Sequence, residues 1–147
     1  FHPRDPGLRL LPDSNVLYDI HFYSPFPFTS VASDTSSYNL DIAWFKSTLR
    51  DYLPASFYDA ALDRFTVPIH IGEYGVVHEK YENNLGAQQW MRDITAAFNA
   101  YGIHRELFAY NEARFGIHQG WNSYAGEHTV TTNELKAVVQ ELNGITP

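Results

Sequence analysis

The sequence predicts an α/β fold in which about three parallel strands carry covering helices. Segments rich in β-branched and aromatic residues alternate with longer segments whose apolar residues recur at helical spacing. Strands that alternate with helices in this way form βαβ units with right-handed connections. With 147 residues, the chain is long enough for one packed domain and too short for two sizeable ones. We therefore expect a single domain over residues 1–147.

The first unit begins after an extended lead-in. Residues 1–14 contain three prolines and one glycine, a composition typical of irregular extended chain. The three strand-helix units are expected over residues 15–147, and residues 15–23, NVLYDIHFY, form the first strand. Residues 24–37 contain two prolines and many serines and threonines, which indicates a loop.

Two helices are expected between the first strand and the second. Residues 38–53 carry apolar side chains at helical spacing, and Pro54 ends the run. These apolar positions are Ile42, Phe45, Leu49 and Leu53. A shorter helix is expected over residues 57–65, with Ala61 and Leu62 on its inner face.

The second unit has the strongest pattern in the chain. Residues 67–73 are expected to form its strand, and residues 74–85 a loop. One face of this strand is expected to carry Val67, Ile69, Ile71 and Glu73. Residues 86–101 are expected to form a helix, with Gly102 just past its end. The apolar stripe of this helix consists of Ala87, Trp90, Met91, Ile94, Phe98 and Tyr101.

The third unit is expected to contain one strand, one long loop and one helix. Residues 106–111 form the strand, and residues 112–130 form the loop. The helix begins with Thr131 and Glu134 at the spacing of a capping box, and Gly144 closes it. Its apolar stripe consists of Leu135, Val138, Val139 and Leu142.

The composition excludes several classes of function. The net charge is −7 and the ten Lys and Arg residues are scattered, so no nucleic-acid partner is expected. The absence of cysteine removes disulfides, thiolate metal sites and cysteine nucleophiles. No apolar run approaches the roughly 20 residues of a membrane helix, so no membrane partner is expected. The chain starts at Phe1 without a secretory signal, which suggests a processed chain or a fragment.

The candidate site lies at the end of the second strand. Glu73 follows an apolar run and has Gly72 and Gly75 beside it. The carboxyl ends of parallel strands carry the ligand site in α/β folds. A glutamate at a strand end is also often solvated or salt-bridged, so this position alone leaves both interpretations open. Period-two alternation places His21 and Tyr23 on one face of the first strand, beside the carboxylate if that face is the ligand side.

No metal ion or cofactor is expected. Alternation places His70 on the face opposite Glu73, so we expect this histidine to face the helices and to be structural. The histidines at positions 104, 118 and 128 lack the tight spacing of metal ligands, and the chain has no HExxH pattern. It also has no phosphate-type glycine loop.

Several segments, in chain order, resemble parts of the family 5 glycoside hydrolases, the cellulase family. Residues 15–29 are similar to the sixth barrel strand and its loop, and residues 67–75 to the seventh strand. Further similarities are Gly86, Ala87, Trp90 and Asp93 at the start of the seventh helix, residues 101–104 and 107–110 at the eighth strand, and Phe115 and Gly116 at the turn after it. The resemblance runs from about Asn15 to the end. It implies a partial (β/α)8 TIM barrel, because a full barrel takes about 250 residues.

The resemblance implies a role for each matched residue. Glu73 takes the place of the nucleophile of a retaining glycosidase, which forms a glycosyl-enzyme intermediate. His21 and Tyr23 flank the sugar, and a tyrosine in this place commonly donates to the nucleophile and keeps it ionised. The implied activity is that of a β-1,4-glucanase, an endoglucanase-like enzyme, and the implied partner is a β-glucan or a cello-oligosaccharide. The implied location is secreted or periplasmic.

The chain departs from the family pattern in two ways. The family usually has a tryptophan near the end of strand eight as a sugar platform, where this chain has Tyr110 and Asn111. The platform is then either missing or supplied by Tyr110, or by Trp121 in the next loop. The family's acid/base lies on strand four after an asparagine, and nothing in this chain matches that motif.

These departures lead to two interpretations of function. The first is the C-terminal fragment of a retaining β-1,4-glucanase, which carries the nucleophile, lacks the acid/base and is inactive alone. Its partner is then the missing N-terminal half of the barrel, or a second copy of the chain in a homo-oligomer. The alternative is a non-catalytic scaffold that binds carbohydrate or forms oligomers as a half-barrel.

Overall fold

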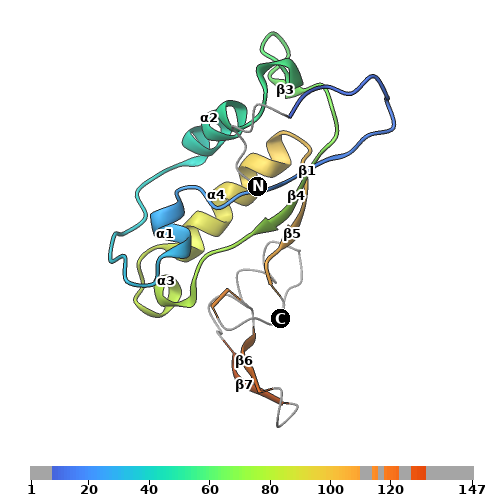
Figure 1. The fold of residues 1–147 in the computed structure, drawn as a ribbon. Coiled ribbons are helices and arrows are strands. Elements are labelled where there is room, and N and C mark those ends of the chain that lie inside the picture. The colour runs from blue at the N-terminus through green and yellow to red at the C-terminus, as the bar shows by residue number, and fades with distance from the viewer. Residues whose placement is uncertain (1–7, 110–113, 116–117, 123–126, 132–147) are drawn as a thin grey trace.

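The computed structural model describes residues 8–109, 114–115, 118–122 and 127–131. Its main sheet has three parallel strands in the order β1-β4-β5 (Figure 1). The strands are β1 (Tyr18–His21), β4 (Ile69–Tyr74) and β5 (His104–Leu107). The predicted α/β class and the three parallel strands are confirmed. Within the described residues the sheet is open, as expected of a partial barrel.

Two helices cover one face of this sheet (Figure 1). They are α2 (Ile42–Tyr52) and α4 (Ala87–Ala100), and both were expected from their apolar spacing. Helix α2 begins four residues later than predicted, because the Asp41 side chain caps it by accepting from the backbone N–H of Trp44 at 2.8 Å. Helix α4 ends as predicted, with Gly102 in the left-handed region at φ 63°.

The core lies between the sheet and these helices and is rich in aromatic rings. Phe22, at the end of β1, packs edge-on against Phe98 of α4 at 6.1 Å between ring centroids. Phe45 of α2 meets Trp90 of α4 edge-on at 5.8 Å, and all four side chains are fully buried. Edge-to-face ring pairs stabilise beyond their buried area by roughly 0.5–1.5 kcal/mol each. This layer holds the three strands in place from one side.

A β-bulge in β4 turns Glu73 away from the helices. Along β1, Ile20 pairs with Ile71, but the next residue, His21, pairs with Glu73, so Gly72 is an extra residue on β4. The register between β4 and β5 shifts over the same stretch. One extra residue reverses the alternation of side chains beyond it. Glu73 therefore lies on the same face of the sheet as His21.

The predicted face of the second strand is thus only partly correct. Ile69 and Ile71 are buried in the core, and Val67 packs against it. The Glu73 side chain, expected on the same face, is 31% exposed on the other side. Tyr74 takes the next inward position, where it is 6% exposed and packs against the rings of α4.

The helix predicted over residues 57–65 is wrong. A short 3-10 helix, η1 (Ala55–Phe57), leads instead into a hairpin of β2 (Tyr58–Asp59) and β3 (Arg64–Phe65). The Asp59 carboxylate accepts from the backbone N–H groups of Ala61 and Leu62, and this local bonding competes with helix formation. Leu62, expected on an inner face, is 58% exposed.

Two predicted loops contain short helices. Helix α1 (Phe26–Ser30) lies in the segment after β1, and α3 (His78–Glu82) lies in the segment after β4. Pro25 precedes α1, and the next proline occupies its second position, where a missing N–H costs nothing. Five-residue helices leave too short a pattern for periodicity to detect.

The third unit differs from its prediction at the boundaries. The strand β5 starts two residues before the predicted 106–111 segment. The predicted loop contains β6 (His118–Asn122), which pairs with the antiparallel strand β7 (Glu127–Thr131). Thr131 is the last residue of β7, and the rest of the predicted helix lies outside the described residues. No helix within the described ranges is long and apolar enough to cross a membrane.

Candidate active site

Glu73 accepts two contacts on one carboxylate oxygen. The His21 Nδ1 atom lies 3.0 Å from Glu73 Oε2, and the Tyr23 hydroxyl donates to the same oxygen at 3.2 Å. The Nδ1 contact requires the tautomer, or the imidazolium, in which that nitrogen carries a proton. The three residues that the sequence placed at one site are therefore adjacent. The side chains of His21 and Glu73 remain 40% and 31% exposed.

Backbone pairing brings the two strand ends together. The N–H of Phe22 donates to the carbonyl of Glu73 at 2.8 Å, which continues the ladder beyond β1. The hydroxyl of Tyr52, at the end of α2, donates to the carbonyl of His21 at 3.3 Å. Rigid elements thus hold both the carboxylate and the imidazole, which favours a preorganised site.

Tyr23 is fixed from the loop that follows β1. The hydroxyl of Thr29, a fully buried residue in α1, donates to the carbonyl of Tyr23 at 2.6 Å. The indole N–H of Trp90 donates to the carbonyl of Ser24 at 3.2 Å. Trp90 was expected in the core and is there, and it also anchors the residue after Tyr23.

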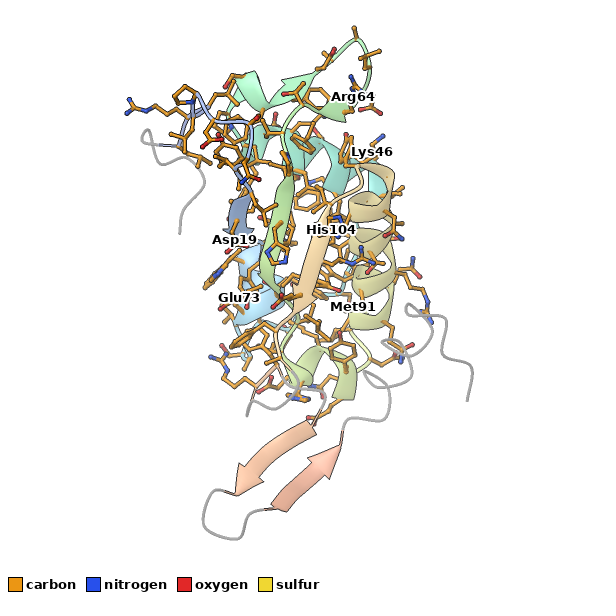
Figure 2. All side chains as sticks on the ribbon, turned by 90° about the vertical axis from the view of Figure 1, so that its right-hand side faces the viewer. Asp19, Lys46, Arg64, Glu73, Met91 and His104 are labelled. Atoms are coloured by element: carbon orange, nitrogen blue, oxygen red, sulfur yellow. The ribbon has the colours of Figure 1, made fainter. Side chains whose placement is uncertain are left out.

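A second polar group lies on the same face as Glu73. His70 Nδ1 lies 2.7 Å from Asp19 Oδ1, and its Nε2 lies 3.8 Å from Glu106 Oε1, so the three residues come from three neighbouring strands. Figure 2 shows Asp19 and Glu73 along the same stretch of sheet. The prediction that His70 faces the helices is wrong, because its neighbours Ile69 and Ile71 occupy that side.

An aromatic cluster beside Glu73 was missed from the sequence. Tyr23 meets Phe115 edge-on at 5.6 Å, and Phe115 meets Phe108 at 6.0 Å. The chain passes close to this cluster at Gly75, where a Cβ would come within 2.5 Å of the Phe108 carbonyl oxygen. Phe108 directly follows β5, so its place after a strand was a signal that could have identified it.

The other predicted sugar-binding residues are not described at side-chain level. Tyr110 and Asn111 lie outside the described residues. Trp121 belongs to the backbone of β6, in a two-stranded sheet separate from β1, β4 and β5. Their expected roles stay predictions.

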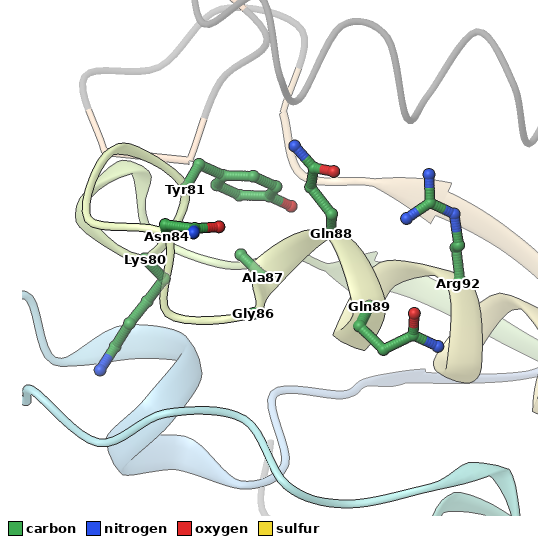
Figure 3. A pocket seen from close by; sticks show the side chains of 8 residues that line it. All are labelled: Lys80, Tyr81, Asn84, Gly86, Ala87, Gln88, Gln89 and Arg92. Atoms are coloured by element: carbon green, nitrogen blue, oxygen red, sulfur yellow. The ribbon is translucent and has the colours of Figure 1, made fainter.

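Two cavities bounded by described residues lie away from Glu73. A cavity of about 230 Å³ opens beside α3 and the start of α4 and is lined by side chains such as Tyr81, Asn84 and Arg92 (Figure 3). A second, of about 170 Å³, lies beside Phe28 and Tyr38. No group of three or more His, Asp or Glu residues within the described ranges is arranged to hold a metal ion.

The arrangement at Glu73 holds its carboxylate in one orientation. Two contacts on one oxygen fix the rotamer of the side chain. Partial exposure leaves the group accessible to a ligand at the end of the strand. Chemically, such a carboxylate can act as a nucleophile, as a base or as an anchor for a sugar hydroxyl.

Several solved structures, endoglucanases and a xyloglucanase among them, have a similar fold. A hyperthermophilic endo-β-1,4-glucanase in complex with substrate is similar over 93% of this chain, with a TM-score of 0.62 and 17% identity. The chain has the fold of part of a family 5 glycoside hydrolase barrel. A broad-specificity endoglucanase from Ruminococcus champanellensis with bound cellotriose has a TM-score of 0.56 and 24% identity over 88% of the chain. A family 5 xyloglucanase from Paenibacillus pabuli has a TM-score of 0.57 and 17% identity over 96% of it.

The partial barrel spans less than half of these enzymes. It covers 42% of the hyperthermophilic glucanase, 37% of the Ruminococcus enzyme and 45% of the xyloglucanase. No protein-family model matches the chain, and no curated protein matches it in sequence. The fold prediction of a partial (β/α)8 barrel is confirmed by the structural similarity.

Proposed function

We propose that the chain carries the nucleophile of a retaining β-glycosidase, and that Glu73 is that nucleophile. One observation carries this proposal: Glu73 Oε2 receives the imidazole of His21 and the hydroxyl of Tyr23 at the carboxyl ends of two parallel strands. In barrels of this kind the carboxyl ends of the strands carry the chemistry. An ionised carboxylate held in one orientation is what attack on an anomeric carbon requires.

The reaction has two displacements. Glu73 attacks the anomeric carbon, the glycosidic bond breaks, and the leaving oxygen takes a proton from a general acid. Water then attacks the anomeric carbon of the glycosyl-enzyme ester, and the bond from that carbon to Glu73 breaks. The group that acted as general acid in the first step now takes the proton of the water. The two carboxyl groups of a retaining site lie about 5–5.5 Å apart. Asp19 and Glu106 share the face of Glu73 but engage His70, so we assign the acid/base to neither.

We propose that a second polypeptide surface completes the site. The chain covers 42% of the similar glucanase, and in the described sheet β1 and β5 each pair on one side only. Unpaired strand edges favour association. Either the remainder of a barrel or a second copy of the chain would cover this face and supply the acid/base. Alone, the chain is then inactive toward unactivated glucan, since general acid help is worth about 10²–10⁴-fold.

The substrate we propose is a β-linked glucan. Solved structures with the same fold are described as endoglucanases, one with bound cellotriose and one in complex with its substrate. The aromatic side chains of Phe108 and Phe115 beside the carboxylate offer apolar faces of the kind on which sugar rings stack. A secreted or periplasmic location would fit a polymeric substrate of this kind.

The engagement of Asp19 and Glu106 with His70 favours one alternative, a non-catalytic half-barrel that binds carbohydrate or forms oligomers. A β-cellobioside with a dinitrophenolate leaving group separates the two, because that group departs without a proton donor. If the proposal holds, the chain releases dinitrophenolate from this substrate, and Glu73→Gln lowers the rate of release by at least about 100-fold. Binding of cello-oligosaccharides without turnover, unchanged in Glu73→Gln, would establish the scaffold instead.

A further inference from the structure

Lys80 is a buried cation that the proposed chemistry does not use. Its side chain is fully buried, and its ammonium donates to the carboxylate of Asp34 at 2.9 Å, to the carbonyl of Asp34 and to the carbonyl of Ser36 at 3.4 Å. It also lies 4.9 Å from the ring centroid of Phe28. Figure 3 shows Lys80 turned away from the other residues that line the cavity beside α3. All its acceptors belong to one segment, residues 31–40.

We call this segment the β1–α2 loop. Tyr38 holds its second half, because its hydroxyl donates to Asp93 at 2.7 Å and its ring stacks on Phe45. The residues before Tyr38 are mostly small and polar, and there Lys80 is the main anchor. The Asp34 carboxylate accepts from the hydroxyl and N–H of Ser36, and these bonds with the Lys80 ammonium lower the Asp34 pKa to about 2. An ionised Asp34 and a buried ammonium thus form one ion pair that fixes the fold of the loop.

A continuous set of bonds joins this ion pair to Tyr23. Lys80 belongs to α3, and the residue that precedes α3, Val77, donates its N–H to the carbonyl of Thr29 at 2.9 Å. Thr29 in turn donates its hydroxyl to the carbonyl of Tyr23. In the second half of the loop, the N–H of Tyr38 donates to the carbonyl of Leu85 at 2.8 Å. The segments after β1 and β4 are therefore tied together on both sides of Lys80.

A buried ion pair is weak evidence for stability, because desolvation offsets much of the attraction. Its better-attested use is to select one arrangement among several. An apolar residue in place of Lys80 would fill the same space but would not favour any one position of the polar loop. The ammonium can reach its three acceptors only when the loop is in the position observed.

We propose that Lys80 is a positioning residue, which holds the β1–α2 loop and α1 so that Tyr23 stays against Glu73. The proposal rests on the function assigned to Glu73 for its relevance to catalysis. The geometric claim stands by itself, because it concerns only whether one hydrogen bond depends on Lys80.

The test follows the Tyr23 hydroxyl in the full chain by NMR with ¹³Cζ-labelled tyrosine. Glu73→Ala removes the acceptor and defines the resonance position of Tyr23 without its bond to Glu73. Lys80→Met is expected to move the Tyr23 signal at least halfway to that position. The control is Lys46→Met, which removes a more exposed ion pair with Asp63, 2.7 Å long, at the far end of the sheet and should not move the signal (Figure 2).

Asp34→Asn, a second variant, removes the partner charge at a partly exposed position and leaves the core intact, so the test survives even if Lys80→Met does not fold. It is expected to shift the Tyr23 signal in the same direction. A folded Lys80→Met or Asp34→Asn protein with an unmoved Tyr23 signal would overturn the proposal. Equal shifts from Lys46→Met would also overturn it, since they would reflect general loosening. The NMR test does not measure turnover. The proposal for Lys80 and the assignment of Glu73 as nucleophile can therefore fail independently of each other.

Discussion

The carboxylate of Asp19 lies directly over Gly72, so closely that a Cβ on Gly72 would come within 2.7 Å of Asp19 Oδ1. Gly72 is the extra residue of the bulge that turns Glu73 toward His21. Bulges next to active sites commonly re-aim one side chain in this way. Because Gly72 has no side chain, the Asp19 carboxylate has room beside the bulge that positions Glu73.

Gly72→Ala is expected to destabilise the chain by about 1 kcal/mol, because the added methyl group must displace the Asp19 carboxylate from its contact with His70. Urea unfolding measures the change. Asp19→Ala removes the obstacle. Adding Gly72→Ala to an Asp19→Ala chain should therefore lower the free energy of unfolding much less than adding it to the wild type. Additive effects of the two substitutions would contradict the close packing of these residues.

Tyr23→Phe is expected to slow the release of dinitrophenolate from the activated cellobioside about 10-fold or more. A hydrogen bond to a charged group contributes about 1.5–3 kcal/mol, and Tyr23 donates one to Glu73. Tyr58→Phe is the matched control, because Tyr58 donates to Asp63 and lies in the hairpin remote from Glu73. The assignment of Tyr23 to the site would fail if both variants kept the rate of the wild type.

The stability contributed by Asp34 is expected to fall at low pH. Its pKa in the folded chain is about 2, below the ordinary 3.8, through bonds to Ser36 and Lys80. A carboxylate with a lowered pKa stabilises the fold above its unfolded pKa and loses that effect as the pH falls through the folded one. The difference in urea midpoint between wild type and Asp34→Asn should be constant above about pH 5 and shrink toward pH 2. A constant difference over this range would count against the ion pair.

Phe45→Ala is expected to cost about 3–5 kcal/mol, because Phe45 is fully buried against Phe22 and Trp90. The control is Ile42→Ala on the same helix, where the side chain is 39% exposed. Thermal unfolding of the two variants should differ by many degrees. Similar losses would mean that α2 does not pack on the sheet as described.

Much of the fold could be predicted from the sequence because its signals are long. Helix α4 has a stripe of apolar residues over four turns, and β4 has a run of branched residues, so both were expected close to their observed bounds. The prediction of a helix from Phe57 to Phe65 was wrong because the apolar residues of this segment have helical spacing without forming a helix. There the carboxylate of Asp59 binds the backbone locally, which periodicity does not detect.

His21, Tyr23 and Glu73 were expected to lie together and do, but the face of the sheet that carries Glu73 was predicted incorrectly. His21 and Tyr23 share a face because β1 alternates regularly, and both contact Glu73. The bulge at Gly72 reversed the alternation in β4, so the assigned faces of Glu73 and His70 could not be obtained by counting residues. A glycine directly before a strand-end carboxylate was the available signal. The contact of Phe115 with Tyr23 depends on how separate segments pack, which no local pattern reveals.

Covalent trapping tests the central assignment most directly. A 2,4-dinitrophenyl glycoside of 2-deoxy-2-fluoro-β-cellobiose needs no acid to lose its leaving group, and the fluorine slows hydrolysis of the glycosyl-enzyme ester. If Glu73 is the nucleophile, mass spectrometry of the digested chain will find the sugar on the peptide that contains Glu73, and the Glu73→Gln chain will carry none. An adduct on another carboxylate, or unmodified protein that still binds cello-oligosaccharide, would contradict the account.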